Sequence, residues 1–293
     1  MTKLKLYKWK SLDISPLYFF PSILIMLFLI AYPILYEFIL SFQQKLKGTY
    51  VYVGLNNYIT LLCDDLFWHS LRVTIIYTLG SISLAFSWGL ILALIVNEKF
   101  RGRILFRTIL LLPWASPLVV VALGFRWIFH ERLGIANYVL KSFLHIDPVP
   151  WLSNETWAMI TAIVVNSWKM APFGMIMILG ALQSIPQVLY EAADIDGANA
   201  FSKFVHITLP SCRGAISTVL LMEIIWSFCS FTVLYLLTEG GPLNATLVLP
   251  IYIYKMGFTR FDFGLASAAS VVLVLIMSFF TFFYIRYIKM RGE

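Results

Sequence analysis

Hydrophobic residues gather along this chain into six long runs, separated by segments that are polar or interrupted by glycine and proline. Each run supplies the roughly 20 mostly apolar residues that a membrane-spanning helix needs. The runs cover about 17–42, 73–97, 105–129, 157–182, 214–237 and 264–285. The first run is too long for the apolar part of a secretion signal, so we expect it to be a retained helix. The pattern predicts an all-α membrane protein, with six transmembrane helices in a single domain over residues 1–293.

The composition excludes a soluble protein. Hydrophobic residues make up 60% of the chain and charged residues 13%, whereas a soluble domain has about 25% charged residues. The mean hydropathy is +0.83. The cysteines, Cys63, Cys212 and Cys229, are odd in number and scattered, which suits neither a disulfide framework nor a C-x-x-C metal site.

The positive charges predict the orientation. If the N-terminus is cytoplasmic, the segments 1–15, 98–107, 183–214 and 286–293 lie inside and carry about twice as many Lys and Arg residues as the longer outer segments. Lys and Arg are enriched in cytoplasmic loops of membrane proteins. We therefore expect both termini in the cytoplasm, as an even number of spans requires.

The segment between the fourth and fifth runs, residues 184–210, predicts two short helices rather than a plain loop. Ser184 and Pro186 suit the start of the first helix, and Gly197 suits its end. A second helix with Phe201 and Phe204 on one face is expected to end before Pro210. The pair either lies on lipid headgroups or presents a surface to a protein partner. Its three acids, Glu191, Asp194 and Asp196, would be repelled by an anionic leaflet, which favours the protein partner.

The same segment matches a spaced motif at every marked position: E-A-A-x-x-D-G-A, then F-x-x-F-x-x-I-x-L-P. The matching residues are Glu191, Ala192, Ala193, Asp196, Gly197, Ala198, Phe201, Phe204, Ile207, Leu209 and Pro210. This motif resembles the coupling motif of bacterial ABC importer permeases. Further stretches resemble the carbohydrate-uptake subfamily of these permeases, and the last resembles its maltose-F or glycerolphosphate-A type: 53–58, 112–113, 168–173 and 237–242.

The resemblance implies the type I importer permease fold and a subunit that performs no chemistry, in a bacterial or archaeal cytoplasmic membrane. It implies a second homologous permease, two ATP-binding subunits, an extracytoplasmic solute-binding protein and a carbohydrate substrate, but no nucleic acid. ATP and Mg²⁺ would be bound by the ATPase, leaving no cofactor, catalytic residue or metal ligand here. The chain contains no Gly-Lys dipeptide, so it has no G-x-x-x-x-G-K-[ST] phosphate loop. Glu191 is expected to pair with a basic side chain of the ATPase, beside Phe201 and Phe204.

Polar residues inside the fourth and fifth spans are candidates for the substrate path, because such residues are costly in a membrane. The resemblance to the maltose-type subunit places substrate contacts at Asn166, Lys169, Met170, Phe173, Glu223 and Ser227. From the residues alone, two interpretations stay open: Lys169 and Glu223 neutralise each other, or their faces line a water-filled cavity for sugar hydroxyls. Trp226 and Tyr235 are candidates for stacking on a sugar, whereas Trp114 and Trp157 are expected at the membrane interface.

Two other classes of protein compete with the importer. A self-contained secondary transporter or channel predicts inverted repeats and coupling acids, but no repeat is visible, and Glu37 and Glu223 are the clear acids within the spans. An intramembrane protease needs a nucleophile and base, or paired acids, at usable spacing, and none is present. The sequence leaves open a disaccharide, a longer oligosaccharide, a uronate chain or a glycerol phosphate as substrate.

Overall fold

The protein is mostly helical and contains helices long and apolar enough to cross a membrane. The computed structural model describes residues 15–46 and 48–292. Five helices there pass the test of length and composition: Phe19–Leu40, Asp65–Asn97, Glu155–Ser184, Ala200–Phe228 and Phe263–Arg286. A sixth candidate is a pair, Arg103–Ala115 and Leu118–Ile128, bent by 94° at the break between them.

The first span and the segment after it form one end of the fold. The span consists of α1 (Ser15–Met26), the π-helical turn η1 (Leu27–Ala31) and α2 (Tyr32–Leu40). An antiparallel hairpin, β1 (Gln43–Leu46) and β2 (Thr49–Tyr52), and the short helix α3 (Asn56–Leu62) follow. The Asn57 amide donates to the carbonyls of Ser41 (2.8 Å) and Gln43 (2.9 Å), so α3 holds the hairpin against the span.

The remaining elements follow in chain order. They are α4 (Asp65–Asn97), α5 (Arg103–Ala115), α6 (Leu118–Ile128), α7 (Ile135–Leu144), α8 (Glu155–Ser184), α9 (Gln187–Ile195), α10 (Ala200–Lys203), the π-helical turn η2 (Phe204–Thr208), α11 (Leu209–Phe228), α12 (Thr232–Thr238), α13 (Leu249–Tyr254), the π-helical turn η3 (Lys255–Thr259) and α14 (Phe263–Gly292).

Two predicted runs are divided in the structure. The run 105–129, expected as one helix, is α5 and α6, because Pro117 has no backbone N–H with which to continue the helix. The run 214–237 is the end of α11, a break at residues 229–231, and α12. Conversely, α4 begins at Asp65, eight residues before the predicted start at 73, because Asp64 caps it by accepting from the N–H of Leu66 (2.9 Å).

Helices elsewhere continue through proline by widening one turn. Pro33 and Pro210 each lie at the start of an α-helix that directly follows a π-helical turn. The N–H of Tyr32 bonds to the carbonyl of Leu27, and that of Leu209 to Phe204, each five residues back. The wider turn absorbs the missing N–H of the proline, so both spans stay unbroken.

The core contains two large buried clusters: one joins α4, α8 and α11, and the other joins α4 to α13 and α14. Helices α4 and α8 lie close together at Gly89, since a Cβ there would lie 2.9 Å from the carbonyl oxygen of Ala171. Tyr252 of α13 belongs to the second cluster and donates to the Asp64 carboxylate (2.6 Å). Its burial and the neighbouring carboxylate raise the pKa of Tyr252 above its usual value.

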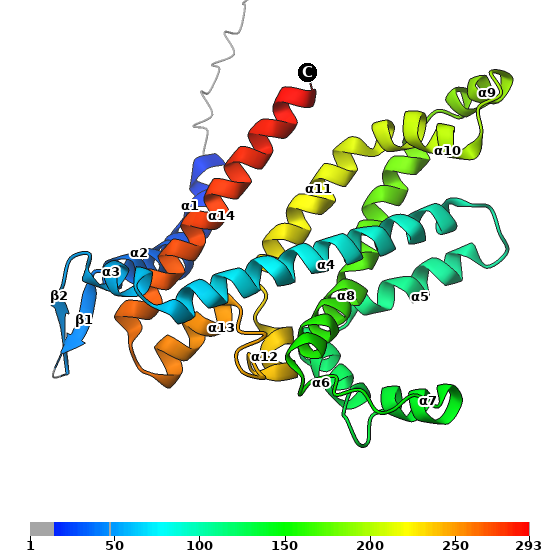
Figure 1. Ribbon diagram of the computed structural model, residues 1–293. Helices are drawn as coiled ribbons and strands as arrows, with labels where there is room; N and C mark the ends of the chain where they lie inside the picture. The colour runs from blue at the N-terminus through cyan, green and yellow to red at the C-terminus, as the bar shows by residue number, and fades with distance from the viewer. Residues whose placement is uncertain (1–14, 47, 293) are drawn as a thin grey trace, which may run out of the picture.

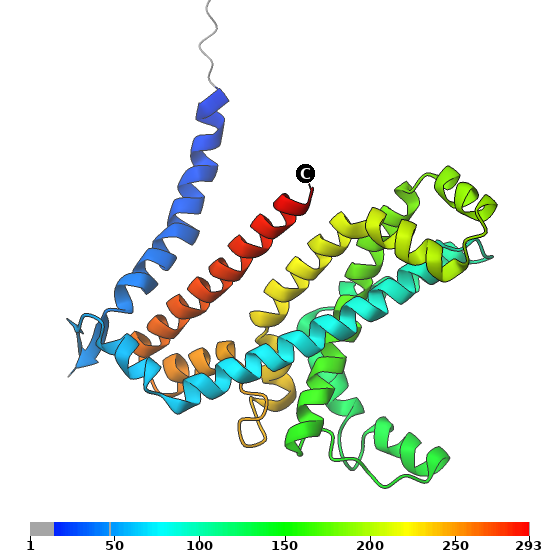
Figure 2. The same ribbon diagram turned by 45° about the horizontal axis from the view of Figure 1, so that its top comes forward.

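Short elements occupy the two ends of the bundle (Figures 1 and 2). The C-terminus of α14, the start of α1 and the α9–α10 pair lie toward one end. The hairpin, α7, α12 and α13 lie toward the other. The first helix stands apart from the α4–α8–α11 core, and only 6% of its apolar window is buried.

Candidate functional site

The α9–α10 pair forms an exposed knob at one end of the bundle, and local chemistry explains its shape. Helix α9 ends in a Schellman motif: the N–H of Ala198 bonds to the carbonyl of Ala193 (2.9 Å), and that of Gly197 to Asp194 (3.1 Å). Gly197 has φ +74°, a left-handed conformation that disfavours a side chain. The expected stop at Gly197 is therefore where α9 ends.

The start of α9 differs in detail from the expectation. Ser184 is the last residue of α8, and its hydroxyl donates back to the carbonyl of Ala181 (2.7 Å) instead of capping α9. The second short helix also does not end before Pro210. It begins at its cap, Asn199, which accepts from the N–H of Ser202 (2.8 Å), and it runs through η2 directly into α11. The second half of the knob is therefore continuous with a spanning helix, so the two would move together.

Side-chain contacts hold the two short helices together. Lys203 of α10 forms an ion pair with Asp194 of α9. Tyr190 of α9 and Thr208 of η2 share a hydrogen bond of 2.9 Å between their hydroxyls. Glu191 forms no ion pair within the described residues and is exposed. The knob is therefore a preformed unit that leaves a carboxylate free at its surface.

The motif residues divide into an exposed and a half-buried set. Glu191, Ala192, Asp196, Gly197, Phe201 and Pro210 are exposed, and Ala193, Ala198, Phe204 and Ile207 are half-buried. Two further apolar side chains, Val188 and Ile195, are 68% and 88% exposed. The surface of the knob combines apolar groups with two acids, Glu191 and Asp196, that form no ion pair within the described residues, and this suits a protein partner better than water.

A cavity of about 540 Å³ lies farther along the bundle, where α8 meets the end of α11 and the bent α5–α6 pair. We call it the span cavity. It is lined by Trp114, Leu118, Asn166, Lys169, Met170, Ile225, Trp226, Cys229, Ser230, Phe231, Thr232 and Val233. Three of the six predicted path residues, Asn166, Lys169 and Met170, are among them. Trp114, expected at the membrane interface, lines the cavity because the helix breaks just after it.

Asn166 and Ser227 connect two walls of the span cavity. The Asn166 amide donates to the Ser227 hydroxyl (3.2 Å), and both residues are buried. Near them, the hydroxyls of Ser230 and Tyr77 share a hydrogen bond of 3.3 Å. Two hydrogen-bonded pairs of uncharged polar side chains therefore lie at this part of the bundle, one between α8 and α11 and one between α4 and the segment after α11.

Lys169 and Glu223 do not neutralise each other. The Lys169 ammonium donates to the backbone carbonyls of Pro113 (3.3 Å), Trp114 (3.1 Å) and Ser116 (2.8 Å). The ion pairs between described residues are Arg126–Glu239 and Lys203–Asp194. The interpretation of Lys169 and Glu223 as an ion pair is therefore wrong for this structure.

Glu223 is buried away from the span cavity. It is 1% exposed, and neither carboxylate oxygen has a hydrogen-bond partner in the described part of the chain. A Cβ at Gly174 would lie 3.5 Å from one of these oxygens, so the carboxyl group packs against α8 at Gly174.

Phe173 supports the aromatic wall from behind. Its ring meets Trp226 edge-on, with centroids 4.8 Å apart, and stacks on Trp114 at 6.2 Å. The other stacking candidate, Tyr235, does not line the cavity and instead packs on Phe231 and Tyr254. Ser230, one of the polar residues expected on the path because it lies within the fifth predicted run, does line the cavity. Thr232 was not singled out from the sequence, because its place at the cavity depends on the break after α11.

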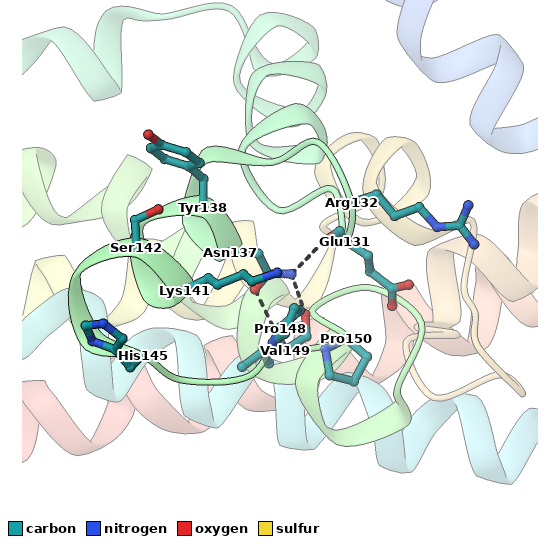
Figure 3. Close-up of a pocket in the computed structure, with 10 residues that line it drawn as sticks. All are labelled: Glu131, Arg132, Asn137, Tyr138, Lys141, Ser142, His145, Pro148, Val149 and Pro150. Atoms are coloured by element: carbon teal, nitrogen blue, oxygen red, sulfur yellow. Dashed lines mark hydrogen bonds between the residues drawn. The ribbon is translucent and has the colours of Figure 1, made fainter.

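A second pocket, of about 930 Å³, lies at the opposite end of the bundle from the knob, beside α7 (Figure 3). We call it the α7 pocket. Asn137 holds it together: its amide donates to the carbonyls of Glu131 (2.9 Å) and Val149 (3.0 Å). Its oxygen accepts from the N–H of Val149 (3.0 Å) and the indole of Trp151 (2.8 Å). One buried side chain thus fastens the segment after α7 onto the helix.

The stretch 237–242 fastens α12 to its neighbours at the same end. The Thr238 hydroxyl bonds to that of Thr246 (2.6 Å), which in turn bonds to the carbonyl of Gly241 (2.8 Å). Arg126 of α6 donates to the carbonyl of Leu236 (3.1 Å) and lies 3.9 Å from the Glu239 carboxylate. This stretch therefore ties the second half of the broken third span to α12.

Comparison with known proteins identifies the family. Residues 85–291 match the family model described as binding-protein-dependent transport system inner membrane component. The trehalose/maltose transport system permease protein MalF of Thermococcus litoralis is 34% identical over 293 residues, covering 98% of this chain and 97% of that protein. The sulfoquinovosyl glycerol transport system permease protein SmoG of Agrobacterium fabrum is 34% identical over 276 residues, covering 92% and 89%.

Solved structures agree with this family. A bacterial ABC transporter involved in the import of the acidic polysaccharide alginate contains a chain with a TM-score of 0.83 and 25% identity, covering 96% of this chain and 97% of that one. The alginate transporter in complex with an alginate pentasaccharide-bound periplasmic protein gives a TM-score of 0.79 at 25% identity, covering 92% and 93%. This chain therefore belongs to the binding-protein-dependent transport system inner membrane components, and it has the fold of ABC importer permeases.

Proposed function

We propose that this chain is one permease subunit of an ATP-driven sugar importer that receives its substrate from an extracytoplasmic binding protein. The proposal rests on two features that such a subunit needs and that this chain combines: a surface for the ATPase and a cavity for the substrate. An exposed knob bearing a free carboxylate lies at one end of the bundle, and an aromatic and polar cavity lies among its spans. Relatives named for sugar transport support a sugar as the substrate.

The knob is the proposed contact with the ATPase. Glu191 pairs with a basic side chain in a cleft of the ATP-binding subunit, and Phe201 and Phe204 pack beside it. Because α10 continues through η2 into α11, a shift of the docked knob displaces the end of a span that also lines the cavity. Such coupling requires that the contacts differ between the two states of the transporter. ATP and Mg²⁺ bind to two separate subunits in this scheme.

The span cavity is this chain's share of the substrate path, and a second homologous permease supplies the other half. Asn166 and Met170 face the path, Ser227 orients Asn166, and Phe173 supports Trp226 and Trp114. An aromatic face and a hydrogen-bonding amide are suited to the apolar face and the hydroxyls of a sugar ring. Glu223 lies behind the wall and is proposed to act through α8 rather than on the sugar.

The proposed orientation places the knob and both termini in the cytoplasm. The excess of Lys and Arg in the sequence segments predicted to lie inside supports this arrangement. The α7 pocket and the hairpin then lie outside, on the side from which a binding protein delivers substrate.

Co-purification tests the proposal. The chain is tagged at its C-terminus, extracted gently from its native membranes, and compared with Glu191→Ala and with Gln187→Ala, a matched change on the exposed surface of the same helix. We expect the wild type to bring down a second permease and an ATPase. Loss of a charge paired across an interface costs about 2–5 kcal/mol, so Glu191→Ala should lower recovery of the ATPase at least tenfold. Gln187→Ala should leave it unchanged.

The opposite result would favour a self-contained secondary transporter. If all three versions are purified alone, under conditions that keep a known ABC importer intact, the ATP-driven mechanism is wrong. If the ATPase is recovered equally with Glu191→Ala, the importer stands and the role given to Glu191 is wrong.

A further inference from the structure

The break between α5 and α6 leaves backbone carbonyls without their usual partners. In a continuous helix, the Pro113 carbonyl would accept from residue 117 and the Trp114 carbonyl from residue 118. Pro117 has no N–H, and the chain bends by 94° before α6. The N–H of Ser116 is shared between the carbonyls of Leu112 (3.0 Å) and Pro113 (3.3 Å), so the backbone replaces the lost bonds only in part. A carbonyl left without a partner inside a membrane costs several kcal/mol, so the break needs another donor.

Lys169 of α8 supplies that donor. Its ammonium group has three N–H bonds, and three carbonyls accept from it: those of Pro113, Trp114 and Ser116, at 2.8–3.3 Å. Lys169 is 5% exposed. A cation at this position also faces the negative end of the α5 dipole. The charge and all three donors of Lys169 are therefore directed at the break.

The break forms part of the wall of the span cavity. Trp114 and Leu118 lie on either side of it and both line the cavity. The position of these two side chains depends on where α5 ends and in which direction α6 leaves. Because α8 holds the break through Lys169, it also holds this wall.

Resting on the proposed function, we infer that Lys169 is a positioning residue of the substrate path and not a cation that binds the substrate. It fixes the α5–α6 break so that Trp114 and Leu118 stand beside Asn166. Among the described residues that line the cavity, only Lys169 carries a charge, and its ammonium group is bound to the carbonyls at the break. The rest of the wall that this chain offers the substrate is aromatic and uncharged.

Thiol labelling tests the inference without knowledge of the sugar. Cys229 lines the span cavity, and both Cys229 and Cys63 are exposed, whereas Cys212 is buried. In the complete complex carrying Cys212→Ser, N-ethylmaleimide labels Cys229 as the reporter and Cys63, after α3, as an internal reference. The rates are compared for wild type, Lys169→Arg, Lys169→Met and Lys141→Met, the last removing an exposed lysine at the α7 pocket.

We expect Lys169→Met, which has similar length but no donor, to change the rate at Cys229 relative to Cys63 at least threefold. Lys169→Arg keeps a charged donor and should stay within twofold of the wild type, as should Lys141→Met. A cation that only binds substrate would leave the rate of this neutral reagent unchanged in every variant. An unchanged rate in folded Lys169→Met therefore overturns the inference.

A second variant covers the case in which Lys169→Met does not fold. Pro117→Ala restores an N–H that can donate to the Pro113 carbonyl, and so removes part of the need for Lys169. The yield of folded complex from Lys169→Met should then be at least threefold higher in the Pro117→Ala background than alone. If the double variant shows only the product of the two separate effects, Lys169 does not act through the break. Loss of ATPase co-purification would count against the proposed function but not against this inference.

Discussion

The close contact between α4 and α8 depends on single residues that lack a side chain. Gly89 of α4 faces the backbone of α8, where a Cβ would lie 2.9 Å from the Ala171 carbonyl oxygen. Gly174 of α8 is different, because a Cβ there would meet the nearest side-chain atoms at 3.5 Å, an ordinary contact distance. Two glycines in one helix crossing thus tolerate substitution differently.

Gly89→Ala should destabilise the protein, and Gly174→Ala should be tolerated. A backbone carbonyl cannot rotate away as a flexible side chain can, so α4 and α8 must separate along their packed length. Overpacking of this kind costs about 1–3 kcal/mol. Thermal unfolding of the purified complex measures the effect, and we expect a clearly lower midpoint for Gly89→Ala alone. Equal midpoints for the two variants would contradict this account of the crossing.

At the scale of elements, several helices end or bend because of residues that lie at the end or bend itself. Gly197 ends α9, Asn199 starts α10, and Pro210 follows a π-helical turn that keeps α11 continuous. By contrast, α7 and the segment after it depend on Asn137, whose side chain makes four hydrogen bonds across up to 14 residues. An element held by one buried side chain is open to a direct test.

Asn137→Ala should loosen the segment that joins α7 to α8. The change leaves the indole of Trp151 and the backbone of Val149 without partners, and each unsatisfied buried group costs about 1–3 kcal/mol. We expect at least tenfold faster proteolysis between residues 145 and 151, measured by mass spectrometry. Asn137→Asp keeps the acceptor for Trp151 and should have an intermediate rate. Ser142→Ala, in the same pocket, is the control, and a matching rate for it and Asn137→Ala would refute this role.

At the scale of the whole molecule, the two candidate functional regions, the knob and the span cavity, lie apart and are joined by helices. The knob continues into α11, and α11 ends at the span cavity, whose opposite wall is held by Lys169 of α8. The cavity presents tryptophan rings and an amide, and its one cation is already bound by carbonyls. This arrangement bears on the charge of the substrate. Similar proteins differ in this respect, since one is a trehalose/maltose transport permease and another belongs to a transporter involved in the import of the acidic polysaccharide alginate.

The molecule carried by this importer is predicted to be a neutral sugar. With Lys169 engaged at the break, no free cation of this chain lines the cavity among the described residues, and an anion there would lack a partner. The binding protein that co-purifies with the complex can be denatured and its released ligand identified by mass spectrometry. A neutral mono- or oligosaccharide is expected. A uronate or a sulfonated or phosphorylated sugar would require a cation from the partner permease and would contradict the prediction for this chain.

Much of this protein was predictable from the sequence because the signals are local. Apolar runs are long enough to indicate spans regardless of their neighbours, and the motif from Glu191 to Pro210 carries its own cap and stop residues. The division of the run 105–129 was missed, although Pro113 and Pro117 lie within it. Proline permits a continuous helix at Pro33 and Pro210, so its presence alone does not say which helices break.

The sequence by itself determined where most of the long apolar helices form and where the exposed knob lies between them, since hydrophobicity and helix capping act between residues that are near in the chain. The tertiary structure alone decided that Lys169 bonds to carbonyls more than 50 residues away and that Glu223 is buried beside Gly174. It also decided that Trp114 lines a cavity rather than an interface. These facts depend on which helix faces lie against one another, and that follows from the packing of all the spans together.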